Sequence, residues 1–203
     1  MADGRAASSA AVSSLAESFS VMDWREDPAA QLEGAFRLAG ERIYRLLEGR
    51  GGSTGVACRI YQERLWFASV GDSCLYLLRD HQLGRLNRPH NMRHLLYLRE
   101  LQAGRADPVP GREHPESDAL TSFLGMEDME QVDLLRRPLS LEQGDVLLLC
   151  SDGVSGTLPE EVLVACLEQD TPRFMCKAME QEIVKRALSH QDNYTAVVIR
   201  CVK

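Results

Sequence analysis

The sequence lacks the features of a membrane or secreted protein. No apolar run approaches the length of about 20 residues that a membrane-spanning helix needs, and the N-terminus has no charged-then-apolar signal segment. Lysine and arginine form no long run, and the formal net charge is −7. These absences exclude a spanning helix, argue against nucleic acid as a partner and predict a cytoplasmic location.

Cysteine is present, but two of its common uses are not expected in this chain. No two of the six cysteines form a Cys-x-x-Cys pair, so a zinc knuckle is not expected. A disulfide framework fits poorly in a chain of 203 residues. Four of the cysteines lie inside apolar, strand-like runs: Cys58, Cys74, Cys150 and Cys201. We therefore expect reduced thiols in a protein core.

With 44% hydrophobic residues, the chain has enough apolar material for one ordinary domain over residues 1–203. Periodicity and proline positions predict helices over residues 6–20, 28–48, 91–103, 159–169 and 172–188. Apolar runs between turn signals predict strands over residues 54–60, 65–70, 74–78, 83–86, 132–139, 146–150 and 193–202. The first four strands read as one antiparallel meander.

Two further segments have no strong periodicity. Residues 104–118 read as a polar loop, because they contain three of the eight prolines. Residues 120–124 read as a short helix or turn. The strands cluster along the chain instead of alternating with helices. This order predicts an α+β fold, a four-layer αββα sandwich of two mostly antiparallel sheets flanked by helices.

Two aspartates stand at the ends of apolar strands. Asp152 follows the run 146–150 in a Ser-Asp-Gly sequence, and Asp192 opens the last predicted strand. A buried strand holds a side chain at its end rigidly, and paired carboxylates suit an oxygen-ligated metal site for hydrolysis. The alternative is that both aspartates only form turns, since Asp-Gly and Asp-Asn are ordinary turn dipeptides.

The motifs, taken together and in order, resemble the protein phosphatase 2C family in its bacterial form, the metal-dependent Ser/Thr phosphatases. The matching segments are Asp-Gly at 3–4, Gly-Ser-Thr at 52–54, Val-Gly-Asp-Ser at 70–73, Leu-Asn-Arg-Pro-His-Asn at 86–91, Leu-Thr-Ser-Phe-Leu-Gly at 120–125, Ser-Asp-Gly at 151–153 and Asp-Asn at 192–193. They cover essentially the whole chain.

The resemblance implies hydrolysis of phosphoserine and phosphothreonine in proteins through a water that bridges two Mg²⁺ or Mn²⁺ ions. It implies that Asp3 bridges both ions, that Gly4 offers its carbonyl oxygen, and that Asp152 and Asp192 hold the second ion. A third, looser ion held with a residue of the 104–118 flap, Asp118, is an open alternative. By family analogy, the substrate is a phosphoprotein of a Ser/Thr kinase system.

Two departures from the family pattern leave alternatives open. The chain starts two residues before Asp3, so the family's first strands, with their own acidic motif, are not in it, and the sequence reads as N-terminally short. Arg5 stands where the family usually has glycine; it is either a phosphate-binding guanidinium or a solvent-facing residue. The runner-up reading is a phosphatase-like binding module with an incomplete metal site. An aspartyl-phosphate hydrolase is a remote third reading, since Cys150 stands where its motif needs an acid.

Overall fold

The computed structural model describes residues 4–23, 25–186, 189 and 191–202. The chain divides into two compact units. Unit 1 comprises Met1–Arg59, Trp66–Asp72 and Arg88–Arg137, and unit 2 comprises Ile60–Leu65, Ser73–Asn87 and Pro138–Lys203. No helix within the described residues is long and apolar enough to cross a membrane.

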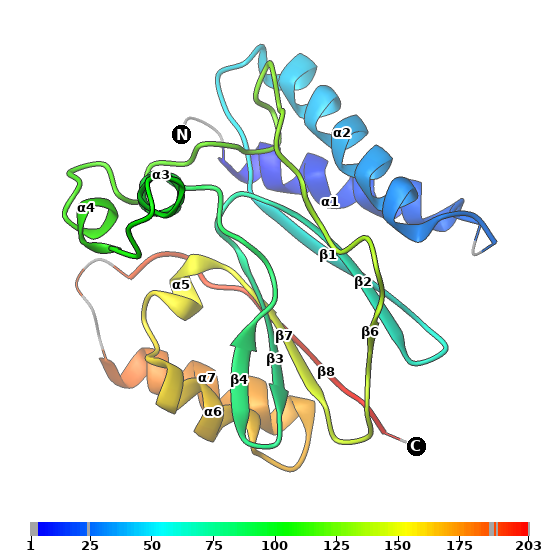
Figure 1. Cartoon of the computed structure of the whole chain (residues 1–203). Helices are drawn as coiled ribbons and strands as arrows, with labels where there is room; N and C mark the ends of the chain where they lie inside the picture. The colour runs from blue at the N-terminus through cyan, green and yellow to red at the C-terminus, as the bar shows by residue number, and fades with distance from the viewer. Residues whose placement is uncertain (1–3, 24, 187–188, 190, 203) are drawn as a thin grey trace. The chain divides into compact units, whose positions relative to one another are not determined.

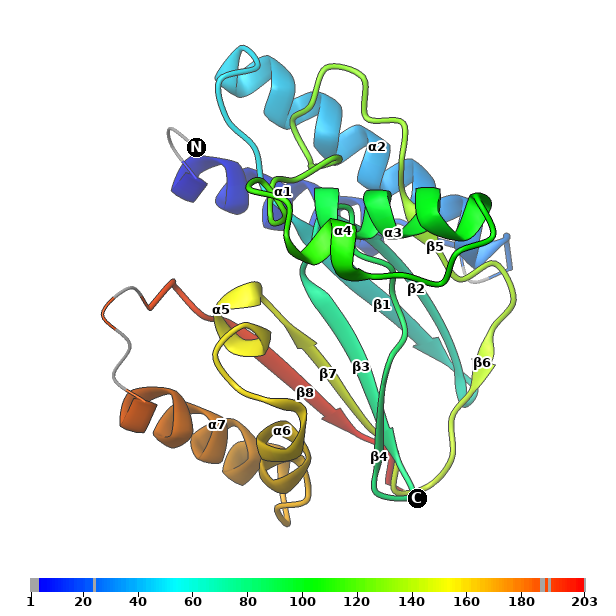
Figure 2. The ribbon, with the colours of Figure 1, turned by 60° about the vertical axis from the view of Figure 1, so that its left-hand side comes forward.

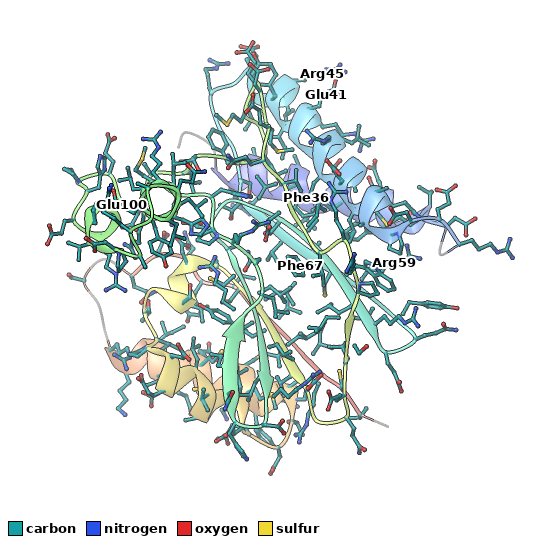
Figure 3. The ribbon with its side chains drawn as sticks, in the orientation of Figure 1. Phe36, Glu41, Arg45, Arg59, Phe67 and Glu100 are labelled. Atoms are coloured by element: carbon teal, nitrogen blue, oxygen red, sulfur yellow. The ribbon has the colours of Figure 1, made fainter. Side chains whose placement is uncertain are left out.

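Two long helices dominate unit 1. Helix α1 spans Gly4–Ser20 and α2 spans Pro28–Leu47, and the two lie against each other (Figure 1). The carboxylate of Asp27 accepts a hydrogen bond from the backbone N–H of Ala29 at 2.9 Å, which caps the start of α2. Phe36 is fully buried on the inner side of α2, whereas Glu41 and Arg45 form an ion pair on its outer side (Figure 3).

The first sheet contains strands β1 (Gly55–Tyr61), β2 (Arg64–Val70), β5 (Asp133–Leu134) and β6 (Leu139–Ser140). Its order is β1-β2-β5, and β6 also pairs with β2. The single strand predicted over 132–139 is therefore wrong, because the structure has two short strands there. Pro138 lacks the N–H that a continuous ladder needs, and the arginines before it are exposed.

The predicted loop at 104–118 is also partly wrong. It contains the short helix α4 (Val109–Arg112), which packs on α3 (Met92–Gln102), as Figure 2 shows. The segment 120–124 is not a helix. Its ends form isolated bridges, Asn91 with Leu120 and Ser53 with Leu124.

Unit 2 is built on a second antiparallel sheet with the order β4-β3-β7-β8. Its strands are β3 (Cys74–Arg79), β4 (Gln82–Arg85), β7 (Val146–Cys150) and β8 (Ala196–Arg200). Helices α6 (Glu160–Leu167) and α7 (Pro172–Arg186) pack on it, and the short α5 (Asp152–Ser155) follows β7 directly (Figure 2).

The expected class is confirmed: the fold is α+β, with two antiparallel sheets and accompanying helices. The continuous four-stranded meander predicted over residues 54–86 is wrong, because β1 and β2 belong to one sheet and β3 and β4 to the other. Gly71 lies in the connection at a φ of +94°, where a Cβ atom would be 2.4 Å from Thr54. Because β2 and β3 belong to different sheets, the Gly-Asp-Ser segment connects the two sheets and does not close a hairpin. Its glycine is needed for the positive φ and for the close approach to Thr54.

Candidate functional site

Asp152 lies where the buried strand β7 ends. Four of the five residues of β7 are buried, and Asp152 is the exposed first residue of α5. One carboxylate oxygen accepts the backbone N–H of Gly153 at 2.9 Å. A rigid strand therefore places a carboxylate with one oxygen oriented by its own backbone.

Asp192 precedes β8, the neighbour of β7. The register pairs Cys150 with Ala196, so the end of β7 and the start of β8 are adjacent. One oxygen of the exposed Asp192 accepts the N–H of Asn193 at 2.8 Å. For neither aspartate does the described part of the chain provide a second side-chain hydrogen bond, so each keeps one carboxylate oxygen available to a ligand.

The two aspartate segments touch at Gly153. A Cβ atom on Gly153 would lie 2.4 Å from the carbonyl oxygen of Asn193 and 3.3 Å from that of Asp192. Only glycine permits this approach, which gives the Asp-Gly sequence at 152–153 a steric reason beyond turn formation. The structure therefore brings the backbone segments that carry Asp152 and Asp192 into contact within unit 2.

Gln191 holds this contact, and sequence reasoning did not find it. Its amide nitrogen donates to the carbonyl oxygens of Gly153 at 3.0 Å and Asp192 at 3.1 Å, and its carbonyl accepts from Thr157 at 3.0 Å. Ser151 adds a hydrogen bond from the N–H of Thr195 to its hydroxyl at 3.0 Å. A glutamine directly before an aspartate carries no motif, so only the fold reveals this role.

The described ones among the other predicted site residues, Gly4, Arg5 and Asp118, belong to unit 1. Asp3 lies outside the described residues. Gly4 and Arg5 are exposed at the start of α1 in unit 1. The carboxylate of Asp118, the candidate flap ligand, pairs instead with Arg93 at 2.7 Å on the surface of unit 1.

The donor set of the described site fits a hard divalent cation. It offers two carboxylates with backbone carbonyls beside them, the oxygen ligands that Mg²⁺ and Mn²⁺ prefer. The described residues contain no group of three or more His, Cys, Asp or Glu side chains placed to hold a metal ion. Within the described residues, Asp152 and Asp192 would thus supply two carboxylates to such an ion, and further oxygens would have to complete its coordination.

A buried ion pair lies at the opposite end of β7. Arg79 on β3 donates to both carboxylate oxygens of Asp145, at 2.8 and 2.6 Å, and pairs with Glu142 at 2.8 Å. Burial disfavours the charged form of Asp145, but the hydrogen bonds from Arg79 and from the N–H of Glu142 outweigh it. The pKa of Asp145 is therefore lowered, and this pair serves structure, not the candidate site.

Known proteins resemble the chain in sequence and in fold. No protein-family model matches the sequence. The serine/threonine phosphatase Stp of Listeria monocytogenes is 32% identical over 149 residues, which cover 73% of this chain and 56% of the relative. The chain thus spans about half the length of this relative.

Two solved structures superpose on nearly the whole chain. The PPM Ser-Thr phosphatase MsPP of Mycobacterium smegmatis has a TM-score of 0.80 at 26% identity, covering 99% of this chain and 84% of that one. The catalytic domain of the phosphatase PstP, solved in complex with two manganese ions, has a TM-score of 0.76 at 24% identity, covering 98% and 82%. The fold is that of the metal-dependent Ser/Thr phosphatases. In sequence and in fold the chain resembles the bacterial protein phosphatase 2C family, as its motifs predicted.

Proposed function

We propose that the chain takes part in metal-dependent hydrolysis of phosphoserine and phosphothreonine in proteins. The observation that carries the proposal is the contact of the two C-terminal aspartate segments, Asp152 beside Asp192, in a chain with a phosphatase fold. Relatives named Ser/Thr phosphatases support the substrate class.

The proposed metal ligands are the residues that the motif resemblance implies. Asp152 and Asp192 would hold one divalent ion through their available oxygens, Asp3 would be shared by both ions, and Gly4 would offer its carbonyl oxygen. The manganese-containing structure of PstP supports Mn²⁺ or Mg²⁺ as the ion. Two such ions supply an activated water and neutralise phosphoryl charge, which phosphate monoester hydrolysis needs because its uncatalysed rate is very low.

Other residues of the chain hold the proposed metal ligands in position. Gln191 fixes the Asp192 segment to Gly153, and β7 fixes Asp152, so the two carboxylates are oriented before any ion arrives. Arg5 is proposed as a phosphate-binding guanidinium, because it is exposed two residues after Asp3. Asp118 is proposed for a third ion, which it would bind only after its carboxylate leaves Arg93.

Metal titration of the 203-residue chain tests this proposal. Calorimetry should show Mn²⁺ binding that is lost in Asp152→Asn and in Asp192→Asn but kept in Asp170→Asn, an exposed aspartate of the same unit. Hydrolysis of an aryl phosphate and of a phosphothreonine peptide should require Mn²⁺. It should fall more than about 100-fold in the two site variants, since even outer-shell partners of a metal cost 10–100-fold.

The outcomes separate the two function classes. Activity that persists in a chelator, or unchanged rates in both site variants, overturns the enzyme proposal. Metal-dependent binding of a phosphoprotein without turnover identifies the alternative, a phosphatase-like binding module. A Ser/Thr kinase system as the source of the substrate and a cytoplasmic location stay predictions.

A further inference from the structure

Two cysteines face each other across the second sheet. In the antiparallel register of β3 and β7, Cys74 is the direct partner of Cys150, and the two strands lie side by side in Figures 1 and 2. Directly opposed residues point to the same face of a sheet, with Cα atoms about 4.5–5.5 Å apart. A disulfide needs a Cα separation of about 4.4–6.8 Å, so the register places the pair within bonding range.

Both cysteines are buried, with 2% of Cys74 and 3% of Cys150 exposed. The Cys74 thiol donates to the hydroxyl of Ser155 at 3.3 Å.

The other cysteines do not share this arrangement. All six are free thiols, and Cys74 and Cys150 are the one pair of cysteines registered opposite each other among the strand pairs that the structure describes. Cys166 is buried to a similar degree, at 4%, but lies on α6 with no cysteine across from it. Position in the sheet, not burial, therefore distinguishes the pair.

We propose that Cys74 and Cys150 form a reversible disulfide when the protein meets hydrogen peroxide. The Cys74 thiolate attacks one peroxide oxygen, the O–O bond breaks, and after proton transfer a sulfenic acid and one water are formed. The sulfur of Cys150 then attacks the sulfenic sulfur, the S–O bond breaks, and the Cys150 proton leaves with the oxygen as a second water. Two thiols are oxidised, one peroxide is reduced, and the atoms balance.

This disulfide would remove a hydrogen bond that β3 makes to α5. Bonding to Cys150 removes the proton that Cys74 donates to Ser155, the last residue of α5. The same helix begins at Asp152, two residues after Cys150. The bridge is thus a covalent modification next to the candidate site, and its formation does not depend on whether that site binds metal.

Peptide mapping of the peroxide-treated protein tests the proposal. The reduced, folded, metal-free chain is treated with hydrogen peroxide, free thiols are blocked with N-ethylmaleimide, and the chain is digested with trypsin and a glutamate-specific protease. Residues 65–79 then carry Cys74 alone, and residues 143–160 carry Cys150 alone. We expect two of the six thiols to disappear, and these two peptides to be linked until a reductant is added.

Three cysteine variants, treated with peroxide in the same way, test the role of each thiol. Cys166→Ser should still form the link, whereas Cys74→Ser should form none. In Cys150→Ser, the sulfenic acid of Cys74 should persist and react with a 1,3-dione probe. Six thiols remaining after treatment of the folded wild-type protein, or a link between other cysteines, overturns the proposal even if every variant fails to fold.

Discussion

The cores of the two units are made of different side chains. In unit 1, half of the buried residues of the core cluster are alanines, and they lie on α1, α2, β1 and β2: Ala7, Ala11, Ala29, Ala39, Ala57 and Ala68. In unit 2, the described core cluster contains no fully buried alanine; leucine, methionine, cysteine, valine and isoleucine fill it. Small side chains let helices approach closely, whereas large ones fill the space between a sheet and its helices.

This difference predicts opposite sensitivities. A core of large side chains loses stability when atoms are removed, because a cavity remains. A core of alanines loses stability when atoms are added, because the neighbouring backbone must move. The two units should therefore respond differently to the same kind of substitution, and that difference can be measured.

Removing atoms from the core of unit 2 should have the largest effect. Leu148 on β7 has no solvent exposure. Leu148→Ala should lower the free energy of unfolding by about 2–5 kcal/mol, measured by urea denaturation. Val197→Ala on β8, where the side chain is about half exposed (51%), is the control and should cost well under that amount. Equal losses in both variants would show that unit 2 is not close-packed around β7.

Each unit also contains one buried aspartate held by an arginine, and the two pairs should differ in strength. In unit 2, Arg79 is 28% exposed and binds Asp145, Glu142 and a backbone carbonyl. In unit 1, Arg88 is 71% exposed and binds Asp133 at 2.8 Å. Arg79→Met should destabilise by about 3 kcal/mol, because it removes a mostly buried guanidinium from a buried carboxylate. Arg88→Met should cost about 1 kcal/mol, although Asp133 is buried too, because water already screens the exposed guanidinium of Arg88.

The pH dependence of the Arg79→Met effect tests whether the ion pair with Asp145 causes it. The pKa of Asp145 is lowered in the folded protein, so its ionised form stabilises the fold above the ordinary aspartate value of 3.8, and this contribution is lost as pH falls through the lower folded value. The effect of Arg79→Met on urea unfolding should be full at neutral pH and shrink in acid. A loss that is the same at every pH would assign the role of Arg79 to packing alone.

Adding atoms to the core of unit 1 should have the next largest effect. Ala39 on α2 has no solvent exposure, whereas Ala30 on the same helix is exposed. Ala39→Leu should destabilise by about 1–3 kcal/mol. Ala30→Leu should be close to neutral, since alanine and leucine both favour helices. If Ala39→Leu were as stable as the wild type, the contrast between the two cores would not hold.

The sequence predicted the long, periodic elements of both units. Helices α2 and α7 begin at Pro28 and Pro172, as the proline signal indicated, and β7 is the apolar run before Asp152. Periodicity succeeds here because each element has one clearly apolar face or is buried on both sides.

The prediction failed where pairing partners decide the structure. Whether the strands before and after Gly71 pair with each other or with distant segments is a long-range choice, and local sequence does not encode it. The break between β5 and β6 did have a local signal, Pro138 and the arginines before it. The prediction of one strand over residues 132–139 gave more weight to the apolar residues on either side. In the site, a strand-end pattern found Asp152 and Asp192, but Gln191 acts through carbonyl oxygens that only the folded chain brings into reach.

The smallest expected effect concerns the backbone at the end of α2. Glu48 has a φ of 50° and a ψ of 40°, a left-handed conformation that costs a residue with a side chain about 1–2 kcal/mol. Glu48→Gly should therefore stabilise unit 1 by about 0.5–1 kcal/mol, after the extra flexibility of glycine in the unfolded chain is subtracted. This exchange removes only a highly exposed ion pair, Glu48 with Arg50 at 2.9 Å, which contributes little. The same exchange at His81 in unit 2, where φ is 63°, should gain less, because it removes the contact of His81 with the less exposed Glu168 at 2.6 Å. Urea unfolding of both variants measures the difference. A larger gain at His81 would mean that its contact with Glu168 contributes nothing, which would contradict the raised pKa of His81 that this carboxylate causes.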